Sequence, residues 1–247
     1  MGKKSKVGKY MQKKNDVRKV QPLFHDEWDP LSEYERGGDK KYIKNIKPRS
    51  EGQKELMDAM KEHNLTLAIG PAGTGKTYLA IAAAVEAYER GDVERIILSR
   101  PAIEAGESIG YLPGDLEDKM APYLRPLYDS LHDRLGMKRL KQMIESGEIE
   151  IAPVGYMRGR TLNNAFVVID EAQNCTYVQI KMLLSRLGWN ATMVVTGDPD
   201  QSDLLNGLSG LADIAEKLSS VENIGVCHLE EGDIVRHPLV AQMLELI

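Results

Sequence analysis

Short apolar runs and longer helical stretches alternate along most of the chain. Six runs have strand length and few internal polar positions, and they cover residues 65–69, 95–99, 149–152, 166–169, 192–196 and 224–229. Such runs are typical of strands that are buried on both faces of a parallel sheet. The alternation, with right-handed crossovers, predicts an α/β fold with a mainly parallel sheet and helices on both faces. Ligands in such folds bind beyond the carboxyl ends of the strands.

Helical segments are expected between these runs. One begins near Ser50, and others are expected over residues 78–90, 115–135, 176–187, 208–218 and 238–246. Pro122 and Pro126 must interrupt or bend the helix of residues 115–135, because proline lacks an amide hydrogen and its ring clashes with the preceding turn. Residues 101–114 are expected to form a long loop.

The size of the chain allows one folded domain with an appendage. It has 247 residues and 42% hydrophobic content. We expect a single domain over residues 42–247, after a basic arm and irregular lead-in over residues 1–41. Residues 1–20 carry a net charge of +7, so the remaining residues carry −12 of the total of −5. The arm is either a polyanion-binding segment or a solvated tail, and the acidic body restricts any nucleic-acid surface to a local patch.

Hydropathy and cysteine usage indicate the compartment. No segment approaches the roughly 18 uninterrupted apolar residues of a membrane span, and the N-terminus lacks the apolar core of a signal peptide. Cys175 and Cys227 lie far apart without metal-ligand spacing, which fits a reducing compartment. We therefore expect a cytoplasmic protein with no membrane partner.

A glycine-rich run directly follows the first strand and precedes the next helix. It consists of Gly70, Pro71, Ala72, Gly73, Thr74, Gly75, Lys76 and Thr77. This spacing lets backbone amides curl round phosphate oxygens, while the lysine reaches the β- and γ-phosphates and the threonine hydroxyl coordinates Mg²⁺. The helix that follows adds its positive end to the site. A glycine-rich turn that binds nothing is the alternative, which the order of strand, loop and helix disfavours.

Two adjacent carboxylates end the strand of residues 166–169. Asp170 is expected to hold Mg²⁺ together with the Thr77 hydroxyl. Glu171, one residue further, is suited to orient or deprotonate the attacking water. Such a pair can also simply cap the next helix, but a phosphate loop in the same chain favours the catalytic interpretation.

Two glutamines are further candidates. Gln201 lies in the turn after the strand of residues 192–196, where we expect it to contact the γ-phosphate or the water and to sense hydrolysis. Gln53 has two interpretations: with Ser50 it forms a capping box, or its amide faces an adenine edge. From these residues alone, the cap is the safer interpretation.

Together these segments resemble the PhoH family of ATPases, which are similar to the first domain of superfamily-one helicases. The resemblance rests on GPAGTGKT at 70–77, GYMRGRTL at 155–162, VVIDEAQN at 167–174 and TGDPDQSDL at 196–204. It implies a RecA-like P-loop core, ATP and Mg²⁺ as cofactors, ATP hydrolysis, and work on RNA or another single-stranded nucleic acid. It also implies that Gln53 lies in the adenine-reading segment. Some members carry a PIN nuclease domain, which we do not expect in the residues before the match.

An arginine is expected to complete the site from outside this domain. Hydrolysis in this class needs an arginine against the charge on the γ-phosphate, and there is room for only one RecA-like domain. A neighbouring copy in a homo-oligomer, hexameric by analogy with the family, would supply it. Arg236 is favoured because it precedes a helix that begins near Pro238, in the loop after the last strand. Arg158 and Arg160 are expected to contact either ATP or RNA, with a surface salt bridge as the alternative for each arginine.

Other hypotheses remain open. The combination of Tyr111, Lys119, Tyr123 and Arg125 suits stacking on single strands, although core packing and solvated charge explain these residues as well. An oligomeric binding module that ATP switches is the alternative to a motor. A small-molecule kinase fits the phosphate loop but does not explain the water-handling groups.

Overall fold

The computed structural model describes residues 46–101, 116–205, 207–235 and 243. The basic arm, nearly all of the loop expected over 101–114 and nearly all of the helix expected over 238–246 lie outside the described residues, as does Arg236.

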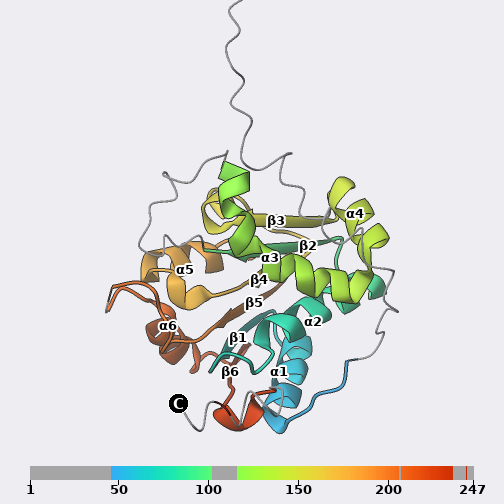
Figure 1. The fold of residues 1–247 in the computed structure, drawn as a ribbon. Helices are drawn as coiled ribbons and strands as arrows, with labels where there is room; N and C mark the ends of the chain where they lie inside the picture. Colours follow the sequence, from blue (N-terminus) through green and yellow to red (C-terminus); the bar gives the residue numbers. More distant parts are fainter. Residues whose placement is uncertain (1–45, 102–115, 206, 236–242, 244–247) are drawn as a thin grey trace, which may run out of the picture.

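A six-stranded parallel sheet forms the centre of the described structure (Figure 1). Its order is β3-β2-β4-β5-β1-β6, and every neighbouring pair is parallel. The strands are β1 (Leu65–Ile69), β2 (Arg95–Arg100), β3 (Ile149–Pro153), β4 (Ala165–Ile169), β5 (Thr192–Gly197) and β6 (Ile224–His228). All six predicted strands are confirmed. The fold is a RecA-like P-loop NTPase fold in a single domain, as predicted.

Helices cover both faces of the sheet (Figure 1). One face packs in a core cluster with residues of α1 (Glu51–Glu62), α2 (Lys76–Arg90), α3 (Leu116–Leu135) and α4 (Met137–Glu145). The opposite face packs with α5 (Tyr177–Leu184) and α6 (Leu211–Leu218). No helix in the described part of the chain is both long and apolar enough to span a bilayer.

The alternation of side chains along β4 determines where its terminal polar residue points. Phe166 and Val168 belong to the cluster of α1 to α4, whereas Val167 and Ile169 belong to the cluster of α5 and α6. Because successive side chains in a strand point to opposite faces, Asp170 is directed toward α2. The sheet therefore brings this carboxylate to the phosphate loop.

α3 continues through Pro122 and Pro126, and Figure 1 shows that it changes direction along its length, which agrees with the expected bend. Two other helices differ from the predictions. α4 was not predicted, because its buried apolar face is narrow, with only Leu140 and Met143 buried. α5 ends at Leu184, before the predicted residue 187. Beyond this end, the Arg186 side chain donates to the backbone carbonyl of Met182, which lies in the last turn of the helix.

Short 3-10 helices follow three of the strands: η2 (Val154–Met157), η3 (Ala172–Asn174) and η4 (Glu231–Asp233). All three lie at the carboxyl edge of the sheet, which is the edge that carries the candidate site.

Candidate functional site

The phosphate loop joins β1 to a helix start that no side chain caps. Gly75, the N-cap of α2, has left-handed dihedral angles (φ 86°, ψ 11°), and the first turn contains no acidic residue. By contrast, the hydroxyls of Ser50 and Thr176 cap α1 and α5. Free amides at a helix start, together with the helix dipole, form a binding site for anions such as phosphate. The loop is therefore suited to the ligand that its sequence predicts.

Gly70 is required by close backbone packing. Its φ is 142°, and a Cβ atom at this position would lie 2.2 Å from the carbonyl oxygen of Leu229. Any side chain would push the loop away from the residue that follows β6. The glycine thus keeps the loop against the end of the sheet.

The Lys76 side chain folds back over the loop. Its ammonium donates to the carbonyl oxygens of Gly70 (2.6 Å) and Pro71 (2.7 Å), and the residue is 8% exposed. Burial lowers the pKa of Lys76, and the carboxylates of Asp198, Glu171 and Asp170 act in the opposite direction. A phosphate beside the ammonium would offset its desolvation.

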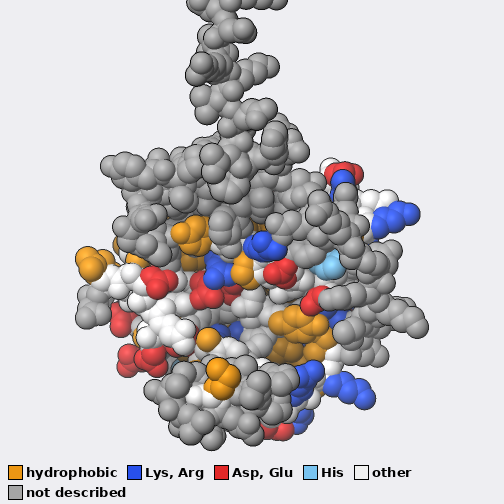
Figure 2. Space-filling model, viewed as in Figure 1, with side chains coloured by type: hydrophobic (Ala, Val, Ile, Leu, Met, Phe, Trp, Pro, Cys, Tyr) orange, Lys and Arg blue, Asp and Glu red, His pale blue; other side chains and the backbone are white. Residues whose placement is uncertain are grey.

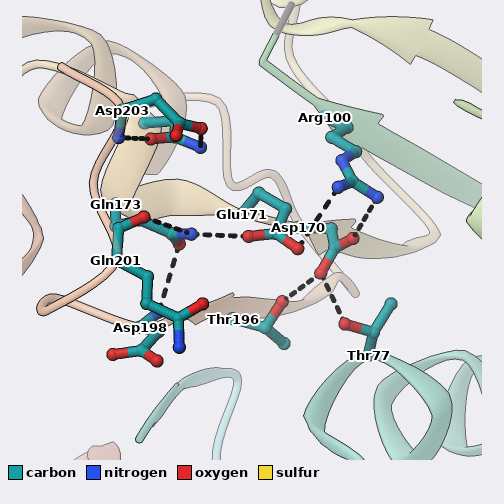
Figure 3. Close-up of polar contacts among 10 residues, drawn as sticks. Thr77, Arg100, Asp170, Glu171, Gln173, Thr196, Asp198, Gln201 and Asp203 are labelled. Carbon is teal, nitrogen blue, oxygen red and sulfur yellow. Dashed lines mark hydrogen bonds and ion pairs between the residues drawn. The ribbon is translucent and has the colours of Figure 1, made fainter. Parts of the chain in front are cut away.

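Asp170 meets the predicted metal-binding threonine directly (Figure 3). Its Oδ1 accepts hydrogen bonds from the hydroxyls of Thr77 (2.6 Å) and Thr196 (2.7 Å). The residue is 2% exposed. Two residues that are distant in sequence, the last of the phosphate loop and the first after β4, are therefore in hydrogen-bond contact.

These two residues suit a magnesium ion that arrives with a nucleotide. Mg²⁺ keeps several waters and takes one or two protein oxygens beside substrate phosphates. Thr77 and Asp170 supply such oxygens. The described residues contain no cluster of three or more His, Cys, Asp or Glu that would hold a metal by itself. The donor set thus fits Mg²⁺ bound jointly by protein and phosphate.

Glu171 has an unusual backbone and a carboxylate that is contacted on both oxygens. Its dihedral angles are left-handed (φ 53°, ψ 42°), which costs a non-glycine residue about 1 to 2 kcal/mol. Oε1 accepts from Arg100 Nη2 (3.3 Å), and Oε2 accepts from Gln173 Nε2. The side chain is still 36% exposed, so it remains accessible to water.

Gln173 links the ends of β4 and β5. Its Nε2 donates to Glu171 and, at 3.5 Å, to the carbonyl of Gln201, while its Oε1 accepts from the amide of Asp198 (3.1 Å). Gln173 is 2% exposed, whereas Gln201 is exposed at the same edge (Figure 3). A hollow of about 830 Å³ beside the phosphate loop is lined in part by Pro71 and Gln201. Gln201 therefore shares a cavity with the loop.

Gln53 makes half of the expected capping box. The Ser50 hydroxyl accepts from the Gln53 amide (3.2 Å), which confirms the cap. The reciprocal half was predicted wrongly, because Gln53 Oε1 accepts from the amide of Arg49 (2.9 Å) and its Nε2 donates to the carbonyl of Thr74 (2.9 Å). The side chain is buried and ties α1 to the phosphate loop. One N–H and one oxygen lone pair remain, so the adenine contact stays a prediction.

The candidate arginines differ in their surroundings. Arg160 forms a two-pronged ion pair with both carboxylate oxygens of Glu150, and the hydrogen bond from Arg160 lowers the pKa of that carboxyl. This contact matches the salt-bridge alternative. Arg158 is exposed, and Arg236 lies outside the described residues.

The possible nucleic-acid surface is only partly described. Tyr111 and the side chain of Lys119 lie outside the described residues, while Tyr123 is half-buried and Arg125 is exposed. Basic and acidic side chains are interspersed on the face in Figure 2. Whether these residues bind single strands stays a prediction.

Three residues of the site were assigned no role from the sequence: Arg100, Gln173 and Thr196. Arg100 and Thr196 lie at the carboxyl ends of β2 and β5, and Gln173 lies in η3, which follows β4. These three strands are neighbours in the sheet. Their polar character at the strand ends was visible in the sequence. The order of the strands was not, and only that order brings Arg100 beside the two carboxylates.

The model of the PhoH-like protein family matches residues 45–247. The PhoH-like protein of Bacillus subtilis (strain 168) is 49% identical over 236 residues, which are 95% of this chain and 71% of that protein. The PhoH-like protein of Synechocystis sp. is 49% identical over 201 residues (81% and 61%). Protein PhoH of Escherichia coli (strain K12) is 46% identical over 202 residues (81% and 57%).

The chain is thus shorter than these relatives and spans between 57% and 71% of their lengths. Among solved structures, the large terminase from a thermophilic bacteriophage aligns over 81% of this chain and 50% of its own, with a TM-score of 0.49 and 13% identity. The family match and the three relatives agree with the motifs of the nucleotide site, and the chain belongs to the PhoH-like protein family.

Proposed function

We propose that this chain is a Mg²⁺-dependent ATPase. The observation that carries the proposal is the contact of Thr77 with Asp170 at 2.6 Å, with Glu171 as the next residue. A metal-phosphate site and a water-accessible carboxylate then lie side by side, which is the arrangement that hydrolysis of a phosphoanhydride requires.

Each residue has a role that follows from its surroundings. The uncapped start of α2 and the Lys76 ammonium bind the β- and γ-phosphates, and Thr77 and Asp170 hold the metal. Magnesium, when bound, neutralises phosphate charge. Glu171 orients the water and accepts its proton, because a carboxylate has about four acceptor positions and the two described hydrogen bonds leave others available.

The two glutamines act at the ends of the nucleotide. Gln201 senses the γ-phosphate, a role supported by its exposure and by the cavity that it shares with Pro71. Gln53 reads the adenine edge with its remaining donor and acceptor.

We further propose that hydrolysis is coupled to RNA, or to another single-stranded nucleic acid, in a cytoplasmic homo-oligomer. A single RecA-like domain over residues 42–247 needs an arginine from a neighbouring copy, and Arg236 is our candidate. Exposed Arg158 and the basic arm of residues 1–20 are suited to phosphate backbones.

ATP turnover by the purified chain, with and without single-stranded RNA or DNA at two salt concentrations, tests this function. We expect turnover that requires Mg²⁺ and that RNA stimulates, with less stimulation at high salt because phosphate contacts weaken as counterions compete. Lys76→Ala should abolish nucleotide binding or turnover. An absence of turnover under all of these conditions would refute the ATPase proposal.

An ATP-switched oligomeric binding module is the second candidate. Contacts of Arg100 and Gln173 with Glu171 favour it, because a carboxylate held on both oxygens also suits a resting state. Nucleotide-dependent assembly without stimulation of turnover by nucleic acid would support this candidate over the motor. A constant specific activity on dilution to monomers would contradict the role of a neighbouring arginine.

A further inference from the structure

Arg100 connects the two site carboxylates, which follow β4, from the neighbouring strand β2 (Figure 3). β2 lies next to β4 in register, with Ser99 opposite Ile169, so that Arg100 ends β2 beside Asp170. Its Nη1 is 3.5 Å from Asp170 Oδ2, and its Nη2 is 3.3 Å from Glu171 Oε1. The guanidinium thus offers one nitrogen to each carboxylate.

The two carboxylates depend on this contact to different degrees. Asp170 also accepts from the hydroxyls of Thr77 and Thr196, and its side chain is 3% exposed. The Glu171 side chain is 36% exposed, and among the described residues its carboxylate accepts hydrogen bonds from Arg100 and Gln173 alone. Loss of Arg100 would therefore leave Asp170 in position and release one of the two contacts that orient Glu171.

We infer that Arg100 is a positioning residue that acts on hydrolysis through Glu171. This inference rests on the proposed ATPase function. A glutamate side chain has three rotatable bonds, and ordering them costs conformational entropy. Contacts that already hold Glu171 in one orientation mean that this cost does not add to the barrier of the reaction. The positive charge of the guanidinium also reduces the electrostatic repulsion between the two adjacent carboxylates.

This role differs from that of the arginine expected from a neighbouring copy. Arg100 comes from the same chain, and among the described residues its ion-pair partners are the two carboxylates rather than the residues of the phosphate loop. Its removal should slow the chemical step without weakening nucleotide binding.

The test compares Arg100→Ala, Arg100→Lys and the wild type in steady-state ATP turnover and in binding of a non-hydrolysable ATP analogue. We expect Arg100→Ala to lower kcat by about 10- to 100-fold, because a misplacement of about 1 Å in the reacting geometry can cost roughly 10²-fold in rate. KM, analogue affinity and the Mg²⁺ concentration at half-maximal rate should each change by less than about threefold, because Asp170 keeps its two hydroxyl partners. Arg100→Lys, which retains the charge but not the planar fork, should recover part of kcat.

Arg95→Ala is the matched control. Arg95 begins the same strand at the opposite edge of the sheet, where it donates to the carbonyl of Asn163 (3.2 Å). The Arg95→Ala variant should hydrolyse ATP at the wild-type rate.

The outcomes separate this inference from the function on which it rests. If the wild type does not hydrolyse ATP, the proposed function fails. If the wild type is active and Arg100→Ala has the same kcat, the inference alone fails. A tenfold or greater rise in the Mg²⁺ requirement of Arg100→Ala, the usual scale for a lost metal-supporting contact, would show action through Asp170 and would also overturn it.

A folding defect is checked by urea unfolding of each variant. If Arg100→Ala is unfolded, Arg100→Gln, whose shorter and neutral side chain cannot contact both carboxylates, carries the same expectation for kcat and KM. A Gln variant with wild-type kcat would then contradict the role of Arg100.

Discussion

Asp170 and Glu171 are neighbours in sequence with opposite environments. Asp170 is 2% exposed at the end of a strand, and two hydroxyls donate to one of its oxygens. Glu171 is partly exposed on a left-handed backbone, and its carboxylate is contacted by two long side chains. One carboxylate is fixed by the sheet, and the other is held at the edge of the solvent.

The difference corresponds to the two tasks that the proposed ATPase function requires. A metal ligand must have a constant position, because Mg²⁺ tolerates little departure from octahedral geometry. A group that handles water must be reachable by water and must exchange partners during the reaction. Rigid burial suits the first task and partial exposure suits the second.

Glu171→Gln gives the largest expected effect. An amide cannot accept the proton of the attacking water, so kcat should fall by about 10²- to 10⁴-fold while Mg²⁺-ATP affinity stays unchanged. Single-turnover hydrolysis and equilibrium binding of a fluorescent nucleotide measure the two quantities. Glu62→Gln, at the exposed end of α1, is the control. Turnover at the wild-type rate would remove Glu171 from the chemical step.

Asp170→Asn should affect the metal rather than the water. The loss of charge beside Thr77 should raise the Mg²⁺ concentration at half-maximal nucleotide binding by about 10- to 100-fold, while binding without Mg²⁺ changes little. A magnesium titration at constant nucleotide concentration checks this. If the Mg²⁺ dependence were that of the wild type, the two carboxylates would not differ in the way that we propose.

Thr196→Val sharpens the comparison by removing a support of the buried carboxylate only. Thr196 is 1% exposed, and its hydroxyl donates to Asp170. Loss of a hydrogen bond to a charged group should lower the free energy of unfolding by about 1.5 to 3 kcal/mol. Urea unfolding measures it, with Thr192→Val at the other end of β5 as the control. Equal stability of the two variants would mean that this hydroxyl contributes nothing to holding Asp170.

The smallest effect concerns the lysine that faces both carboxylates. Because burial lowers the pKa of Lys76 in the folded state, the unfolded chain binds more protons between the folded pKa and the usual value of 10.5. Without nucleotide, the contribution of Lys76 to stability should therefore increase as pH rises through this interval. Lys76→Met should remove that part of the pH dependence. Urea unfolding at several alkaline pH values compares the two proteins, and identical slopes would contradict the burial effect.

The fold was largely predictable because it depends on local patterns. Each strand is a short apolar run between turns, and each was located to within one or two residues. The positions of the glycine-rich loop before a helix and of Asp170 after a strand were also predictable, since loop spacing and strand ends are properties of neighbouring positions. α4 was missed because only a narrow face of it is apolar. The second half of the Gln53 cap was wrong because Gln53 Oε1 accepts from the amide of Arg49, while its Nε2 is directed to the distant carbonyl of Thr74.

The sequence by itself determined the parallel α/β class, the phosphate-binding spacing and the position of the acidic pair after a strand. Only the tertiary structure decided that Thr77 meets Asp170, that Arg100 reaches both carboxylates and that Glu171 has a left-handed backbone. Local patterns specify which residues form a strand and which face is buried. They do not specify the order of strands in the sheet, and that order determines which polar ends become neighbours.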